Sequence, residues 1–240
     1  MDVTPLSVSA FVVAAVAVMR LAALADANLK AREARKSWAL LGYDRRAAGW
    51  DPCLVYWDPL PMTHEVLDVP TAPDAPDAVG DRLANGHPFI NGRWADRSWL
   101  SVPGPFFIGA GGGGPEARMA AAHFLADDGG RSFVHRQPRT PREVCDFLGV
   151  AAIGPAGGCG WDGDEYWTPA AVRAWWADRD RVRAWIDARL ADPDPAYHDP
   201  ATLRAFAAHL DHGLEDYLRG YLFWLITGRQ PTRHDPLPPL

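Results

Sequence analysis

Residues 168–190 read TPAAVRAWWADRDRVRAWIDARL. Thr168 followed by Pro169 is typical of a helix start, because the threonine side chain caps free backbone amides and proline fits the first helical position. At 100° per residue, seven apolar residues fall on one side of such a helix: Val172, Trp175, Trp176, Val182, Trp185, Ile186 and Leu190. The pattern predicts one amphipathic helix that continues to Pro193.

Two more helices are expected on either side of this one. Asp199 and Pro200 start the later helix, which Gly228 ends after about residue 227. Its apolar side has seven members: Leu203, Phe206, Leu210, Leu214, Tyr217, Tyr221 and Leu225. The earlier helix begins at Thr140-Pro141-Arg142-Glu143, which has the capping-box pattern and predicts inward-facing Val144, Phe147 and Leu148.

Strands are expected in the first half of the chain. Four apolar runs predict them: 53–57, 99–102, 106–108 and 131–136. The last run follows an Asp-Asp-Gly-Gly turn at 127–130, and prolines throughout 58–92 exclude a long helix there. The order predicts an α+β fold, with short, irregular, mostly antiparallel strands of the first half packed against three or more C-terminal helices. We expect an N-terminal helix at 1–41 and a single α+β domain at 42–240.

The N-terminal segment is apolar and then basic. Residues 6–25 contain one charged residue, Arg20, and four basic residues follow: Lys30, Arg32, Arg35 and Lys36. The run is long enough for a membrane anchor whose basic flank would keep the domain on the cytoplasmic side. A cleaved signal peptide, a buried helix and a disordered extension are the alternatives. Three cysteines without a CxxC pair fit a reducing compartment, so a cytoplasmic location is expected, with membrane anchoring as the alternative.

Residues 157–167 form the first candidate site. They read GGCGWDGDEYW, and the residues chosen for ligand binding are Trp161, Asp162, Asp164, Glu165 and Trp167. Aromatic faces beside carboxylates accept cations, so this loop predicts a site for a basic protein or a cationic small molecule. Ligation of a hard cation by the carboxylates is a second possibility. Packing of the tryptophans in the core, with solvated acids, is a third.

His209, His212 and Asp216 form a second candidate, a metal site. On one continuous helix their side chains share a face, and all three are residue types that bind metal ions. A solvated polar face is the alternative. Gly213 and Gly220 lie on the same stripe, which predicts close approach of another backbone or of a ligand there, or a kink. Cys159, with a histidine as base, is a weaker candidate nucleophile.

Two functions from different classes follow. The 24 basic and 30 acidic residues give a net charge of -6, which argues against binding to duplex nucleic acid. The 11 tryptophans and the acidic-aromatic loop favour a non-enzymatic interaction protein, such as an immunity or self-protection factor. The alternative is a metal-dependent or acid/base hydrolase or transferase, with a site between the 157–167 loop and the His209 face and with Arg136 or Arg139 holding an anion. The sequence assigns no cofactor and no catalytic residue.

Overall fold

The computed structural model describes residues 54–67, 91–109, 122–151, 158–194 and 199–240. Within them the fold is α+β, with short antiparallel strands followed by a mostly helical C-terminal part. The predicted N-terminal helix at 1–41, including the candidate anchor at 6–25, lies outside the described residues. In the part of the chain that is described, no helix has the length and apolar character needed to cross a bilayer.

The strands form two antiparallel pairs. β2 (Phe124–Ala126) pairs with β3 (Ser132–Val134), and β1 (Phe107–Ile108) pairs with β4 (Cys159–Gly160). Asp127 closes the β2–β3 turn, since its Oδ1 accepts the N–H groups of Gly129 at 2.9 Å and Arg131 at 3.0 Å. The predictions at 106–108 and 131–136 are therefore confirmed, whereas β2 and β4 were not predicted.

Two of the expected strands are wrong. Residues 54–57 and 99–102 contain no strand. The second run is instead a local turn, in which the Ser101 N–H donates to the Ser98 carbonyl at 3.0 Å while Leu100 enters the core. An apolar run indicates that its residues are buried, but buried residues need not form the hydrogen bonds of a strand.

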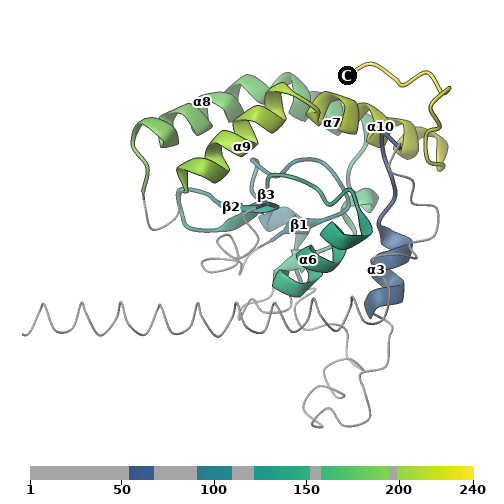
Figure 1. The fold of residues 1–240 in the computed structure, drawn as a ribbon, viewed down its shortest axis with the longest axis horizontal. Helices are drawn as coiled ribbons and strands as arrows, with labels where there is room; N and C mark the ends of the chain where they lie inside the picture. The colour runs from purple at the N-terminus through teal and green to yellow at the C-terminus, as the bar shows by residue number, and fades with distance from the viewer. Residues whose placement is uncertain (1–53, 68–90, 110–121, 152–157, 195–198) are drawn as a thin grey trace, which may run out of the picture.

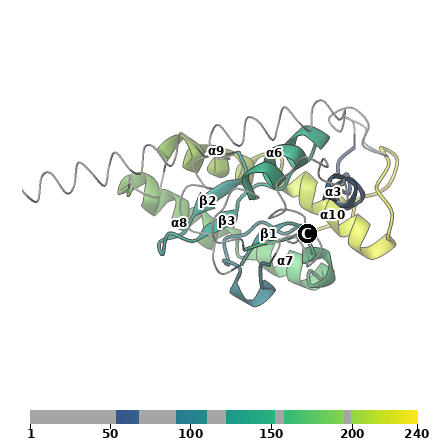
Figure 2. The same cartoon turned by 90° about the horizontal axis from the view of Figure 1, so that it is seen from below.

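The hairpin of β2 and β3 lies between two groups of helices (Figure 1). On one side lies a layer of four helices: α7 (Pro169–Ala177), α8 (Arg179–Ala191), α9 (Pro200–Asp211) and α10 (Leu214–Thr227). On the other lies α6 (Pro141–Ala151), which contacts α3 (Leu60–Leu67), and Figure 2 shows the same arrangement from below. Leu125 and Phe133 face the four-helix layer, whereas Phe124, Ala126 and Val134 belong to the core on the α6 side. Both faces of the hairpin are therefore buried.

The helix starts agree with the predictions. Thr168 Oγ1 accepts the Ala171 N–H at 3.2 Å at the start of α7, and Asp199 Oδ2 accepts the Thr202 N–H at 2.9 Å at the start of α9. Gly228, with φ +69°, ends α10 as expected. These starts and ends are set by side chains within one turn of the boundary, so the sequence identifies them.

The two long predicted helices are each broken into two. Asp178 lies between α7 and α8. Its N–H donates to the Ala174 carbonyl in the last turn of α7, and its own carbonyl accepts the N–H of Arg181 in the first turn of α8. His212 and Gly213 separate α9 from α10, and Gly213 has φ +97°, a left-handed conformation that favours glycine. The predicted apolar residues of both pairs of helices nevertheless lie in or against one core.

Gly220 is the point of close approach that the glycine stripe predicted. A Cβ atom there would lie 2.7 Å from the Cβ of Tyr56, whereas one at Gly213 would meet nothing within 4 Å. We expect Gly220→Ala to lower the free energy of unfolding by about 1–3 kcal/mol through overpacking. Gly213→Ala, the control, carries only the backbone strain of its positive φ, about 1 kcal/mol. Urea denaturation of both variants tests this, and an equal loss would contradict the packing explanation.

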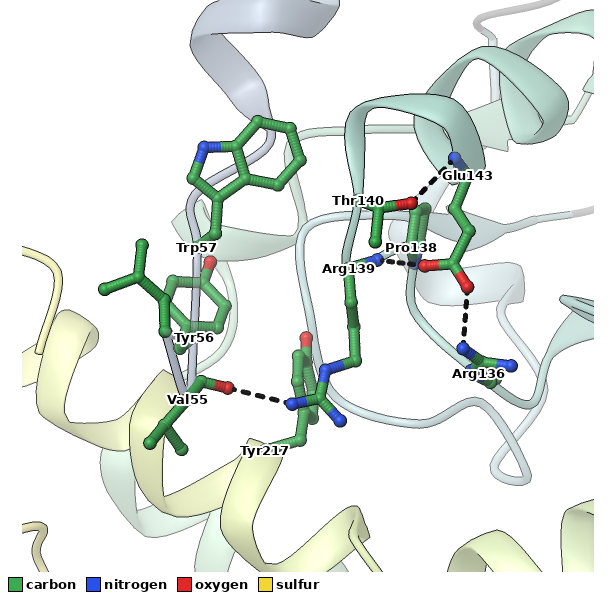
Figure 3. A pocket seen from close by; sticks show the side chains of 10 residues that line it. Val55, Tyr56, Trp57, Arg136, Pro138, Arg139, Thr140, Glu143 and Tyr217 are labelled. Atoms are coloured by element: carbon green, nitrogen blue, oxygen red, sulfur yellow. Dashed lines mark hydrogen bonds and ion pairs between the residues drawn. The ribbon is translucent and has the colours of Figure 1, made fainter. Parts of the chain in front are cut away.

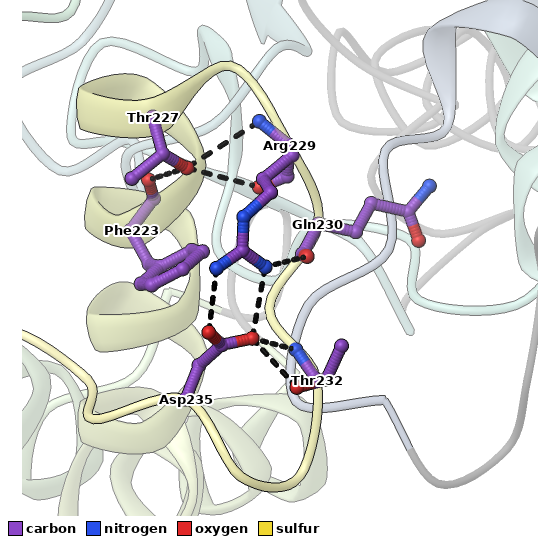
Figure 4. Close-up of polar contacts among 6 residues, drawn as sticks. All are labelled: Phe223, Thr227, Arg229, Gln230, Thr232 and Asp235. Carbon is purple, nitrogen blue, oxygen red and sulfur yellow. Dashed lines mark hydrogen bonds and ion pairs between the residues drawn. The ribbon is translucent and has the colours of Figure 1, made fainter.

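The C-terminal tail is held against α10 by arginines (Figure 4). Arg229 makes a two-pronged ion pair with Asp235, at 2.9 and 2.5 Å, and Thr232 donates its N–H and hydroxyl to the same carboxylate. These hydrogen bonds, first that of Arg229, hold the pKa of Asp235 well below its ordinary value. Arg219 of α10 donates to the backbone carbonyls of 237–238, which fixes the tail along the helix.

Candidate functional site

A cavity of about 260 Å³ lies where the segment 54–57, the connection 136–140 and α10 meet (Figure 3). Ten residues line it: Leu54, Val55, Tyr56, Trp57, Arg136, Pro138, Arg139, Thr140, Glu143 and Tyr217. The lining combines aromatic rings with two arginines and one glutamate. Such a mixture of apolar walls and a few charged groups is typical of sites for small molecules.

The capping box at the start of α6 builds the charged wall of the cavity. The Glu143 N–H donates to Thr140 Oγ1 at 3.2 Å, as the capping pattern predicts. The Glu143 carboxylate accepts the Arg139 backbone N–H at 2.8 Å through one oxygen and Arg136 Nη2 at 2.6 Å through the other. Both oxygens of the glutamate are thus used to position the two arginines.

The Arg139 guanidinium has no carboxylate partner in the described part of the chain. The guanidinium donates a long hydrogen bond from Nη2 to the Val55 carbonyl oxygen, at 3.3 Å. Figure 3 shows the side chain extending from the start of α6 toward Val55 and Tyr217. Because Arg136 is already paired with Glu143, Arg139 supplies the net positive charge of this wall.

Two histidines near this wall are neutral at pH 7. Burial, followed by the positive charges of Arg136 and Arg139, lowers the pKa of His209 to about 4. Burial also lowers the pKa of His123, whose Nδ1 donates to the Arg136 carbonyl oxygen at 3.0 Å. Arg136 and Arg139 thus both lie close enough to His209 to act on its charge.

Two tyrosines, Tyr56 and Tyr217, also line the cavity. The ring centroids of Tyr56 and Tyr217 lie 5.8 Å apart, and Tyr221 lies 5.5 Å from Tyr56 and stacks on Tyr217 at 6.2 Å. Gly220 permits this packing because its missing side chain leaves room for Tyr56. The hydroxyl groups of Tyr56 and Tyr217 are buried and have no hydrogen-bond partner among the described residues.

Asp164 lies beside these tyrosines. Its Oδ1 accepts the Tyr221 hydroxyl at 2.5 Å, while Oδ2 is buried without a partner in the described residues. The pKa of Asp164 is raised to about 7, mainly by burial and in smaller part by the negative charge of Asp58. The hydrogen bond from Tyr221 acts in the opposite direction and lowers this pKa. This carboxyl group therefore takes up a proton at a much higher pH than an exposed aspartate does.

The structure divides the predicted loop residues between the core and the surface. Trp167 is buried in the core under the four-helix layer and Trp161 packs against the α6-side core, whereas Glu165 is exposed and Asp162 is half-buried. Asp164 points inward to Tyr221. These five side chains thus do not form one open acidic-aromatic surface.

The cation acceptor expected in this loop is occupied by the chain itself. The Arg97 guanidinium lies 4.0 Å from the ring centroid of Trp94 and 4.8 Å from that of Trp167. Tyr166 stacks on Trp94 at 4.9 Å, with 13° between the ring planes. The cation at these rings comes from an arginine about 70 residues upstream, which the linear sequence does not connect to the loop.

The predicted metal residues are separated by the helix break. His209 is half-buried near the end of α9, His212 is exposed in the link, and Asp216 is exposed in the first turn of α10. Among the described residues no group of three or more His, Cys, Asp or Glu side chains is placed to hold a metal ion. The shared helical face assumed for this trio does not exist.

Cys159 does not have the properties of a nucleophile. It lies in β4 with 1% of its surface exposed, and burial, followed by the charge of Asp162, raises the pKa of its thiol to about 12. A thiol with this pKa is protonated at neutral pH and reacts poorly.

Sequence reasoning identified the capping box but missed the cavity that it builds. The sequence pattern places Tyr56 in a strand and Tyr217 in a helix core, and it offers Arg136 and Arg139 as anion ligands.

Comparisons with protein families, with curated proteins and with solved structures find no match to this chain.

Proposed function

We propose that this protein is a non-enzymatic binding protein that takes a small anionic molecule into the cavity at the start of α6. Arg139 carries the proposal, because it is an arginine in the cavity wall without a carboxylate partner in the described residues. A planar guanidinium is suited to carboxylate or phosphate, to which it donates two parallel hydrogen bonds.

The charge of the lining supports an anion. Arg136 and Arg139 contribute two positive charges, Glu143 contributes one negative charge, and His209 is neutral because its pKa is about 4. The remaining lining is largely apolar and includes the rings of Tyr56, Trp57 and Tyr217, which favours a ligand with an apolar or aromatic body.

The 157–167 loop is less suited to a ligand than the cavity is. The expectation there was a basic partner or a cationic small molecule. Arg97 already lies against Trp94 and Trp167, so the aromatic faces suited to a cation have an internal partner.

Calorimetric titration with benzoate, acetate and inorganic phosphate tests the proposal. We expect weak binding, tighter for benzoate than for acetate because the aromatic walls cover its ring. Arg139→Gln should weaken binding about 10- to 100-fold, the usual effect of losing a charged hydrogen bond. Arg142→Gln is the matched control, since Arg142 is exposed on the same helix and does not line the cavity.

Two results would count against this function. The first is that none of these anions binds, nor any other carboxylate tested. The second is that the Arg139 and Arg142 variants bind benzoate equally well.

A further inference from the structure

The charged groups that line the cavity can balance one negative charge of a ligand. Arg136 Nη2 donates to the Glu143 carboxylate at 2.6 Å, so these two opposite charges compensate each other (Figure 3). Arg139, in contrast, donates its long hydrogen bond to a neutral group, the Val55 carbonyl. His209 adds no charge at pH 7, because its pKa is about 4. The net charge of this lining is therefore one positive unit.

A second negative charge on the ligand would be unfavourable. The Glu143 carboxylate lines the same cavity. Tyr217 is another lining residue, and after burial the charge of Asp164 is the strongest influence that raises its pKa. Arg139 lowers the pKa of Tyr217, and Asp58 raises it. Arg139 thus acts beside negative groups, and a dianion would bring its second charge close to them, which is costly away from water.

The capping box at the start of α6 uses backbone amides that a phosphate would need. Phosphate sites at helix starts are built from free N–H groups. Here Pro141 has no N–H, and the Glu143 N–H donates to Thr140 Oγ1 at 3.2 Å. The N–H of Arg139, just before the helix, donates to the Glu143 carboxylate at 2.8 Å. A carboxylate does not need these amides, because one guanidinium donates two parallel hydrogen bonds to it.

The apolar part of the lining limits the body of the ligand. Leu54 and Val55 are half-buried at the cavity, whereas Tyr56, Trp57 and Tyr217 are only 2%, 4% and 3% exposed. A ligand would therefore lie mainly against the two aliphatic side chains. An apolar cavity of about 150 Å³ holds one benzene molecule, so a volume of about 260 Å³ holds roughly ten non-hydrogen atoms.

We propose that the ligand is an amphipathic monocarboxylate about the size of octanoate, whose carboxylate bonds Arg139 and whose hydrocarbon body lies against Leu54 and Val55. This inference rests on the proposed function, because it assigns the anionic end to the same arginine. It adds the number of charges, the chemical class of the anion and the size of the body.

Calorimetric titration of the unaltered protein with three compounds that share an eight-carbon chain tests the charge. At about pH 8 octanoate carries one negative charge, octyl phosphate carries nearly two, and octanamide carries none. We expect octanoate to bind at least about 10-fold more tightly than either of the others.

A second series tests the size of the body. It consists of acetate, butanoate, hexanoate, octanoate and decanoate. Affinity should rise about two- to four-fold for each added methylene group up to about octanoate, because each buries more apolar surface, and should then level off.

Glu143→Gln tests why a dianion is disfavoured. Glutamine also occurs at this capping-box position, but it releases Arg136 from its ion pair and removes a negative charge from the cavity. The affinity for octyl phosphate should rise about 10-fold relative to that for octanoate. Glu215→Gln, which removes an exposed carboxylate at the start of α10, is the control and should leave this ratio unchanged.

Leu54→Ala tests the contact with the body. It should weaken octanoate binding about 3- to 10-fold and leave acetate binding unchanged. Ile226→Ala is the control, because Ile226 is 55% exposed and does not line the cavity.

The possible outcomes separate this inference from the proposed function. If octyl phosphate or acetate binds as tightly as octanoate, and Arg139→Gln weakens that binding, the monocarboxylate class is wrong and the anion-binding function remains. If octanamide binds as tightly as octanoate, Arg139 does not hold a carboxylate and both proposals are wrong. If octanoate, benzoate and phosphate all fail to bind, both proposals are likewise overturned.

Discussion

Asp164→Asn should make the protein more stable at about pH 8 and leave its stability nearly unchanged at about pH 4. The pKa of Asp164 is raised from 3.8 to about 7, first by burial. The folded protein therefore holds this proton more tightly than the unfolded chain does between about pH 4 and pH 7. The free energy of unfolding falls as the pH rises through that window, and above pH 7 the cost of the buried charge is complete.

The expected gain at alkaline pH is between about 1 and 4 kcal/mol, because each pKa unit corresponds to about 1.4 kcal/mol. Asparagine keeps an oxygen that can accept the Tyr221 hydroxyl, so the hydrogen bond that Asp164 makes is retained. His209 and His123 also titrate below pH 7, but they are present in both proteins, so the difference between the two pH profiles isolates Asp164.

Urea denaturation across this pH range, without added ligand, measures the difference. Glu165→Gln is the matched control, since it removes the neighbouring carboxylate from an exposed position. A difference profile that is flat from about pH 4 to pH 8 would show that Asp164 ionises normally.

Trp167→Ala should lower the free energy of unfolding by about 3–5 kcal/mol, the usual cost of removing a buried aromatic side chain. The ring is 5% exposed, packs edge-on against Trp94 at 5.3 Å and supports the Arg97 guanidinium. Its loss would leave a cavity in the core under the four-helix layer and remove one of the two rings that face Arg97.

Trp99→Ala provides the comparison, because Trp99 is 37% exposed and its ring contacts Arg181 at the surface. We expect a loss of about 1 kcal/mol or less for this variant. Chemical denaturation of the two variants side by side gives the answer. If Trp167→Ala is no more destabilising than Trp99→Ala, the Trp167 ring is not the structural element that its burial indicates, and a binding role for the loop becomes the better explanation.

The features that the sequence predicted correctly depend on contacts a few residues apart. Thr168 and Asp199 cap their helices through amides three residues ahead, and Thr140 does the same for Glu143. The helix break at Asp178 was missed because aspartate is tolerated inside helices and no glycine or proline marks the position.

The cavity was missed because its walls come from distant parts of the chain. Arg139 reaches Val55 across 84 positions, and Tyr221 reaches Asp164 across 57. A capping box predicts where a helix begins, but it does not say which segment packs against that helix start. The candidate metal site failed for a related reason: its geometry assumed a continuous helix through Gly213, where the backbone instead turns at a positive φ.

The position of the β2–β3 hairpin makes the two cores thermodynamically interdependent. Each strand is only three residues long, and a hairpin of that size is not stable by itself. Leu125 and Phe133 need the four-helix layer, and Phe124 and Val134 need the α6 side, so neither core keeps its own strand surface if the other dissociates. A substitution beneath α6 therefore weakens the packing under α7–α10 as well. This effect requires no direct contact between the two groups of helices.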